Sequence, residues 1–252
     1  MLDEYINKII NDDCLNVLKQ LPDKCVDCFF SDIPYRISQG GSSTTSAFGT
    51  KNKWQNNPAK LELYKKGKIF TENNIEPNEY LPDIYRIMKD KAHGYIMVNS
   101  SNLKNTIQQI EDANFIINNI LVMKKNNCVT NQWYMKDIEF TIFFRKGGAK
   151  PLNNCGIKSC LSVIMPKDKI HETQKPVEYV QTLIGNSTQE NDLVLDCFSG
   201  SGTTAVACHN LKRRFICIEK DPEYWKASCE RLTEEQKQII MDFDLEQTKM
   251  EF

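Results

Sequence analysis

Residues 193–225 read LVLDCFSGSGTTAVACHNLKRRFICIEKDPEYW, and this stretch decides the fold. It begins with an apolar run of strand length, passes through a turn containing Gly200 and Gly202, and continues as a helical pattern from Thr203. A second apolar strand follows and ends in an acid, Glu219. A strand, a glycine turn, a helix and a second strand predict a β-α-β unit of a parallel sheet.

The glycine turn also indicates what kind of ligand the unit holds. Glycines at a strand-to-helix turn let the backbone approach a ligand closely, and an acid that ends the next strand can bind the hydroxyls of a ribose. The sequence GSGTTA lacks the third glycine of a dinucleotide fingerprint, and no lysine follows as in a phosphate-binding loop. We therefore expect an adenosine-bearing cofactor other than NAD or ATP.

Apolar runs alternate with helical patterns along most of the remaining chain. This alternation predicts an α/β fold with a mostly parallel, doubly wound, Rossmann-like sheet in a single domain spanning 1–252. The expected strands are Val26–Ser31, His93–Asn99, Phe115–Met123, Glu139–Phe144, Leu193–Cys197 and Arg214–Glu219.

Three segments depart from the alternation. Residues 36–75 begin with a stretch rich in Gly, Ser, Thr and Asn and are expected to form a flexible loop that faces the substrate. Residues 146–170 are expected to be irregular and are a candidate target-recognition insertion. Residues 233–252 are acidic and are expected to form a solvated C-terminal helix.

The composition excludes several classes of protein. Hydrophobic residues make up 40% of the 252 residues and charged residues 26%, which are ordinary globular values. We expect a cytoplasmic protein, since the chain has neither an apolar run long enough to span a membrane nor a leader pattern. Among the ten cysteines, Cys25 and Cys28 have metal-ligand spacing, but no second pair completes a zinc site, so we expect core packing and no metal.

The charge is distributed unevenly. The chain carries −1 overall, whereas residues 233–252 hold six acids and two lysines, which leaves +3 for residues 1–232. Residues 33–61 contain no acid, and basic groups there could meet the phosphates of a nucleic acid. The candidate DNA-binding residues are Arg36, Lys51, Lys53 and Trp54, of which the tryptophan could stack on or wedge between bases.

The segment DCFSGSGTT at 196–204 resembles the FxGxG cofactor motif of amino-methylating DNA methyltransferases. HETQKP at 171–176 resembles the H-x-T-Q-K-P element that precedes that motif in the same family. The resemblance implies S-adenosylmethionine as the cofactor. It assigns cofactor binding to Asp196, Phe198, Gly200, Gly202, Glu219 and Lys175, with Asp196 near the methionine moiety and Glu219 on the ribose.

Near the N-terminus, Ser31-Asp32-Ile33-Pro34-Tyr35 resembles the catalytic [DNS]-P-P-[YFW] motif of the family, with Ile33 in place of the first proline. An aromatic amine is a poor nucleophile because its lone pair is delocalised into the ring. The carboxylate of Asp32 and the carbonyl of Ile33 would accept its hydrogen bonds, Pro34 would stiffen the turn, and Tyr35 would stack on an extruded base.

The catalytic motif precedes the cofactor motif, which resembles the circularly permuted beta class of this adenine-N6 or cytosine-N4 family. The resemblance implies site-specific methylation of adenine N6 in DNA after base flipping, by direct transfer without a covalent intermediate. The alternatives are cytosine-N4 methylation, methylation of RNA or protein by the same fold, and a catalytically silent DNA-binding subunit. Double-stranded DNA is the expected partner. A homodimer and a cognate restriction endonuclease are both compatible with the sequence, and no membrane is expected.

Overall fold

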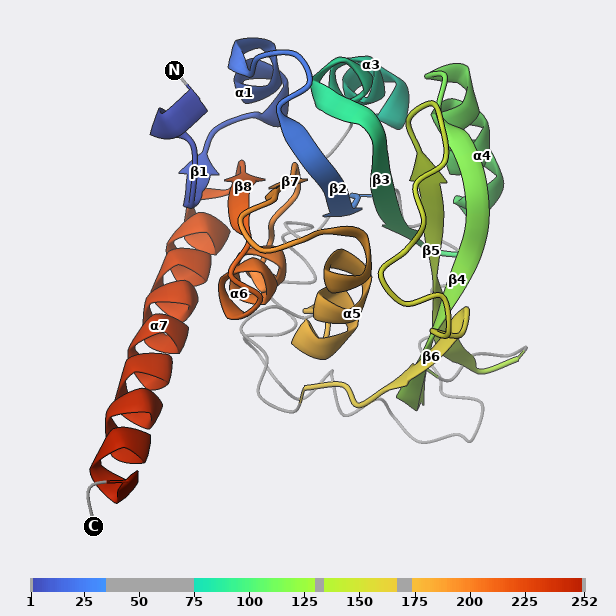
Figure 1. Cartoon of the computed structure of the whole chain (residues 1–252). Helices are drawn as coiled ribbons and strands as arrows, with labels where there is room; N and C mark the ends of the chain where they lie inside the picture. The colour runs from blue at the N-terminus through green and yellow to red at the C-terminus, as the bar shows by residue number, and fades with distance from the viewer. Residues whose placement is uncertain (1, 35–74, 130–133, 167–173, 251–252) are drawn as a thin grey trace, which may run out of the picture.

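The computed structural model describes residues 2–34, 75–129, 134–166 and 174–250, and the side chains of all of these except Val129 and residues 239–250. The described part contains one sheet with helices packed on both of its faces (Figure 1). The strands are β1 Lys8–Asn11, β2 Val26–Asp32, β3 Met88–Val98, β4 Ile116–Val129, β5 Lys136–Arg145, β6 Cys160–Val163, β7 Leu193–Asp196 and β8 Arg214–Glu219. The helices are η1 Leu2–Glu4, α1 Cys14–Gln20, α3 Pro77–Ile87, α4 Leu103–Asp112, α5 Val177–Ser187, α6 Thr203–Asn210 and α7 Pro222–Met250.

The sheet has the strand order β1-β8-β7-β2-β3-β5-β4-β6. Strands β1, β8, β7, β2 and β3 pair in parallel, β5 is antiparallel to both β3 and β4, and β6 is parallel to β4. The prediction of a mostly parallel α/β sheet is therefore confirmed. After β2 the chain moves to β3 on one side, whereas after β7 it moves to β8 on the other, so the boundary between β2 and β7 is a topological switch point. Ligands of such sheets bind where the carboxyl ends of the strands meet a switch point.

Two hydrophobic clusters lie on opposite faces of the sheet. Phe29 of β2 joins the cluster that α1, α3 and α4 cover. Its neighbours Cys28 and Phe30 join the cluster that α5, α6 and the start of α7 cover. Because successive side chains of a strand point to opposite faces, the centre of β2, Cys28–Phe30, is apolar on both faces, and its polar residues lie toward the two ends. The same burial explains the core role of Cys28, and all ten cysteines are free thiols.

The three segments expected to depart from the sheet pattern are only partly described. Residues 36–74, with Arg36, Lys51, Lys53 and Trp54, lie outside the described residues. Residues 146–170 are described as far as 166 and contain the short strand β6, which pairs with β4. Residues 233–250 belong to α7, the long helix that extends beyond the rest of the described chain (Figure 1).

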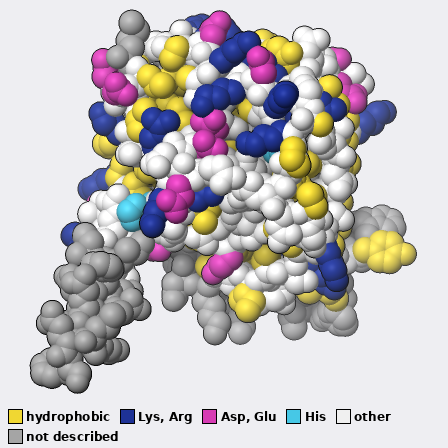
Figure 2. Space-filling model, in the orientation of Figure 1, with side chains coloured by type: hydrophobic (Ala, Val, Ile, Leu, Met, Phe, Trp, Pro, Cys, Tyr) yellow, Lys and Arg dark blue, Asp and Glu magenta, His cyan; other side chains and the backbone are white. Residues whose placement is uncertain are grey.

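Two features of the described residues concern the expected DNA partner and the expected absence of a membrane: the distribution of surface charge and the character of the helices. On the face seen in Figure 2, lysine and arginine side chains alternate with acidic and apolar ones instead of forming one basic patch. Within the described residues, no helix combines the length and the apolar character needed to cross a membrane.

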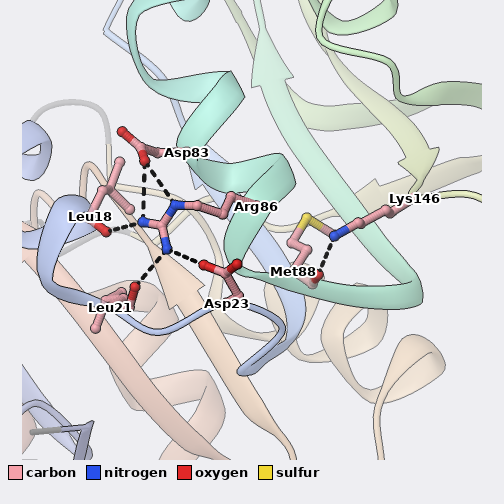
Figure 3. Close-up of polar contacts among 7 residues, drawn as sticks. All are labelled: Leu18, Leu21, Asp23, Asp83, Arg86, Met88 and Lys146. Atoms are coloured by element: carbon pink, nitrogen blue, oxygen red, sulfur yellow. Dashed lines mark hydrogen bonds and ion pairs between the residues drawn. The ribbon is translucent and has the colours of Figure 1, made fainter.

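Arg86 joins the ends of two helices on one face of the sheet (Figure 3). Its guanidinium donates to the carbonyls of Leu18 and Leu21 at the end of α1, both at 2.8 Å, and to the carboxylates of Asp83 at 3.2 Å and Asp23 at 2.7 Å. The carbonyls of the last turn of a helix lack the usual partner four residues on, and Leu18 accepts only the N–H of Leu21 at 3.2 Å from the helix end. Arg86 therefore adds a charged donor to the carbonyls that end α1.

We predict that Arg86→Met lowers the free energy of unfolding by about 2–3 kcal/mol, because two carbonyls lose a charged donor. Arg86→Lys should recover little of this loss, since an ammonium cannot reproduce the guanidinium fork. Lys24→Met is the matched control, because it removes an exposed ion pair with Asp90 and should cost less than about 1 kcal/mol. Denaturant unfolding measures all three variants, and equal losses for Arg86→Met and Lys24→Met would contradict the role of Arg86.

Candidate active site

A hydrogen bond joins the ends of β2 and β7 at the switch point. The hydroxyl of Ser31 donates to Oδ1 of Asp196 at 2.6 Å, although the two residues are 165 positions apart in the sequence. Strands β2 and β7 are neighbours in parallel register, with Phe29 opposite Leu195. The predicted catalytic motif and the predicted cofactor motif are therefore adjacent at one edge of the sheet.

Asp196 organises this junction from inside the protein. It is 2% exposed, and besides Ser31 it accepts hydrogen bonds from the backbone N–H of Phe198 at 3.0 Å and from the hydroxyl of Thr204. Burial raises the pKa of Asp196 to about 6, and the bonds from Ser31, Thr204 and Phe198 oppose that rise. Both carboxylate oxygens thus bind groups of the chain itself, linking β2, β7 and α6.

The glycine turn leaves open space on one side only. Gly200 and Gly202 have φ values of +51° and +75°, in the left-handed region that favours glycine. A Cβ built on Gly200 would meet no heavy atom of the described residues within 4 Å, whereas one on Gly202 would lie 2.9 Å from the Cβ of Ser228 in α7. Gly200 therefore provides a surface against which a ligand can lie, and Gly202 allows α7 to pack closely.

Glu219, at the end of β8, lies beside the same turn. One of its carboxylate oxygens accepts the N–H of Gly200 at 2.7 Å, and the other accepts the N–H of Asp221 at 2.9 Å. Burial raises the pKa of Glu219, and the backbone hydrogen bonds from Asp221, Gly200 and Lys220 oppose this. A carboxylate has about four acceptor positions, so Glu219 can also accept a hydroxyl of a ribose. The turn and Glu219 fit an adenosine-bearing cofactor.

Lys175, which the sequence places among the cofactor-binding residues, contacts the other motif. Its ammonium lies 2.6 Å from Oδ2 of Asp32 and 3.2 Å from Oε2 of Glu139 in β5. Burial raises the pKa of Asp32, while the charge of Lys175 and its hydrogen bond oppose the rise. The ammonium thus stabilises Asp32 as a carboxylate, the form that accepts hydrogen bonds.

Ile33 is 3% exposed and belongs to the hydrophobic core, so its side chain anchors the strand end where the resembling motif has proline. Pro34 follows at the surface and is half-buried. Tyr35 and His171 lie outside the described residues.

The sequence reasoning did not single out Glu139 and Lys125, which extend the charged site. Lys125 of β4 lies 3.1 Å from Oε1 of Glu139. Burial acts to raise the pKa of Glu139, but the charges of Lys175 and Lys125 outweigh it and lower that pKa. The sequence contains one sign of Glu139, which is an acid at the start of the mostly apolar run EFTIFF. A carboxylate on a buried strand needs a cation beside it, so a nearby lysine could have been expected.

Comparisons with known proteins agree with the motifs. Residues 153–230 match the model of a protein family described as DNA methylase (N6_N4_Mtase). The type II methyltransferase M2.MboI of Moraxella bovis is 27% identical over 248 residues, which cover 90% of this chain and 87% of the relative. The type II methyltransferase M.HinfI of Haemophilus influenzae is 25% identical over 261 residues, which cover 92% of this chain and 70% of the relative.

Solved structures share the fold. The M1.HpyAVI–SAM complex superposes with a TM-score of 0.65 at 24% identity, covering 89% of this chain and 98% of that one. The cytosine-N4-specific PvuII DNA methyltransferase superposes with a TM-score of 0.64 at 15% identity, covering 92% and 91%. The family model and the two relatives support an N6/N4 amino-methyltransferase, and the structural likeness shows the fold of S-adenosylmethionine-dependent DNA methyltransferases.

The two glycines of the turn should respond differently to a methyl group. We predict that Gly200→Ala weakens S-adenosylmethionine binding by on the order of 10-fold or more, because the new Cβ enters the open space in which the cofactor would lie. Its cost in stability should be limited to left-handed backbone strain, about 1 kcal/mol, since the Cβ meets no described atom. Gly202→Ala should instead destabilise the fold by about 1–3 kcal/mol, because it combines left-handed strain with a clash against Ser228. Calorimetric titration and thermal unfolding of both variants make the comparison. Unchanged cofactor affinity in folded Gly200→Ala would remove this side of the turn from the cofactor site.

Proposed function

We propose that this chain methylates the exocyclic N6 amino group of adenine in double-stranded DNA, with S-adenosylmethionine as the methyl donor. The observation that carries the proposal is the position of Asp32, a carboxylate held beside the cofactor turn by the bond between Ser31 and Asp196. Similarity to type II methyltransferases over most of the chain supports DNA as the substrate.

The proposed chemistry assigns a distinct task to each acceptor at the end of β2. The target amine is flat and weakly nucleophilic, and hydrogen bonds to its two N–H groups favour the pyramidal form whose lone pair can attack. Asp32 would accept one N–H and the carbonyl of Ile33 the other. Bound S-adenosylmethionine would supply a methyl group on a positively charged sulfur. As the N–C bond forms, the C–S bond breaks and the nitrogen becomes positively charged until it loses a proton.

Electrostatics favours Asp32 as the group that faces this developing charge. Lys175 occupies Oδ2 of the carboxylate, so Oδ1 is the oxygen we assign to the amine. A carboxylate that is already ionised and oriented needs no reorganisation when the nitrogen becomes cationic. Loss of such a group typically costs on the order of 10²–10³ in rate.

The choice of adenine over cytosine rests on Asp32, because the resemblance links the Asp form of the motif with adenine and the Ser form with cytosine. Cytosine-N4 methylation uses the same apparatus and is the nearest alternative, and one superposable structure is a cytosine-N4 enzyme.

We assign DNA contacts to the basic residues of 36–75, outside the described residues, and to residues 146–170. The partners compatible with this function are a second copy of the chain, in a homodimer, and a cognate restriction endonuclease.

Labelled methyl transfer tests the proposal. The chain is incubated with methyl-labelled S-adenosylmethionine and unmethylated DNA, and the DNA is then digested to nucleosides. We expect the label in N6-methyl-2′-deoxyadenosine. Label in N4-methyl-2′-deoxycytidine would replace adenine by cytosine, and DNA binding without any incorporation would indicate the silent DNA-binding subunit.

Asp32→Asn tests the role of the carboxylate. We expect kcat to fall on the order of 10²–10³-fold, while the Kd for S-adenosylmethionine changes less than about threefold, because Asp32 acts on the amine. Asp27→Asn is the control, since Asp27 lies at the opposite end of β2 and pairs with Lys89 at 2.7 Å. A loss of cofactor binding as large as the loss of turnover would overturn the assignment.

Lys175 should set the acidic limit of activity. Asp32 works as a carboxylate, burial raises its pKa and Lys175 opposes that rise. Removing the ammonium in Lys175→Met should therefore raise the pKa of Asp32 further, so activity should be lost at a higher pH than in the wild type. The pH profile of kcat measures this shift. A profile with an unchanged acidic limb would show that Lys175 does not control the ionisation of Asp32.

A further inference from the structure

Four side chains of alternating charge form a continuous row that begins at the proposed catalytic carboxylate. The row runs from Asp32 to Lys175 at 2.6 Å, from Lys175 to Glu139 at 3.2 Å, and from Glu139 to Lys125 at 3.1 Å. These residues come from β2, the segment before α5, β5 and β4, so tertiary packing alone brings them together.

The row is partly shielded from water, most of all at its two lysines. The side chains of Lys175 and Lys125 are 7% and 11% exposed, and those of Asp32 and Glu139 are 25% and 23% exposed. Burying a charge is costly unless an opposite charge lies against it. Two cations and two anions balance here, and each of the two inner groups, Lys175 and Glu139, has an opposite charge on both sides.

Strand register places the carboxylates on the same face of the sheet. Asp32 pairs with Met97, and Met97 pairs with Thr141 of β5. Paired residues point to one face, and Glu139 is two positions from Thr141, so its side chain points to that face as well. Met123 of β4 pairs with Glu139 and therefore points to the same face. Lys125 is two positions after Met123, so its side chain points to this face as well. The distance from β2 to β5 is bridged by the stem of Lys175.

Strand β5 also fixes the helix that follows Lys175. The hydroxyl of Thr141 lies 2.8 Å from that of Tyr179, in the first turn of α5. Glu139 and Thr141 thus hold Lys175 and Tyr179 from two neighbouring positions of one strand. Tyr179 packs in the core beneath.

We propose that Glu139 and Lys125 are positioning residues for catalysis, which act by holding the ammonium of Lys175 on Oδ2 of Asp32. The lysine stem has four rotatable bonds, and an ammonium has no preferred plane, so Lys175 needs a second anchor to stay on one oxygen. Lys125 in turn orients Glu139. The proposal rests on the proposed function, because it takes Asp32 as the group that binds the target amine.

Steady-state kinetics on the full-length chain tests this with Lys125→Met and Glu139→Gln. We expect kcat to fall on the order of 10-fold in each, with the KM for S-adenosylmethionine within about twofold of wild type, because both residues are assigned to act on Asp32 through Lys175 and not on the cofactor. Lys125→Arg should retain most activity, since it keeps the charge against Glu139. Lys89→Met is the matched control: it removes the 2.7 Å ion pair with Asp27 from the start of β2 and should leave kcat unchanged.

A double-mutant cycle separates positioning from general stabilisation. In the Lys175→Met background, adding Lys125→Met should lower kcat no further, because the first substitution already removes the group through which Lys125 acts. Additive losses would overturn the proposal, as would Lys125→Met and Glu139→Gln variants that are folded and as active as Lys89→Met. Thermal unfolding identifies the folded variants. If Lys125→Met does not fold, the same cycle is measured with Glu139→Gln in its place. Failure of the proposed function is distinct, since the wild type itself would then transfer no methyl group to DNA.

Discussion

The bond between Ser31 and Asp196 is the constraint on which the site depends. It joins the carboxyl ends of β2 and β7 at 2.6 Å, across a sequence separation of 165 residues. Without it, the strand that ends at Asp32 and the strand that leads to the Gly200 turn would lose the side-chain bond that joins their ends. Asp196 remains buried because Thr204 and the N–H of Phe198 also donate to it, so one group sets the positions of two strand ends and of helix α6.

The charges of the site follow from where the sheet places them. A carboxylate that meets a developing cation must be ionised, yet it must lie in a dry site to act strongly. The ammonium of Lys175 keeps Asp32 ionised in this site. Lys175 is itself a buried charge, which Glu139 balances from its other side, and Lys125 in turn balances Glu139. The charge row extends from the parallel part of the sheet into its antiparallel part, so strands β4 and β5 contribute to the proposed chemistry although neither carries a motif.

The sequence predicted those features that local patterns determine. Strand β8 was expected at Arg214–Glu219 and has these bounds, because an apolar run between charged ends leaves few alternatives. The strand Lys8–Asn11 was not expected, since four residues are too short to show a period, and β6 forms only by pairing with β4. The adjacency of the two strand ends comes from the sheet order, in which β2 pairs with β7. The contact of Lys175 with Asp32 could not be predicted, because it depends on how α5 packs against β5.

A crystal structure with S-adenosylmethionine bound would show whether β2 and β7 bring the acceptor of the target amine beside the methyl donor. We expect the ribose hydroxyls on Glu219, the cofactor against the open side of Gly200, and the methyl group directed toward the space beside Oδ1 of Asp32, with Lys175 still on Oδ2. A cofactor bound away from the Gly200 turn would contradict this arrangement, and so would Lys175 leaving Asp32 to bind the cofactor.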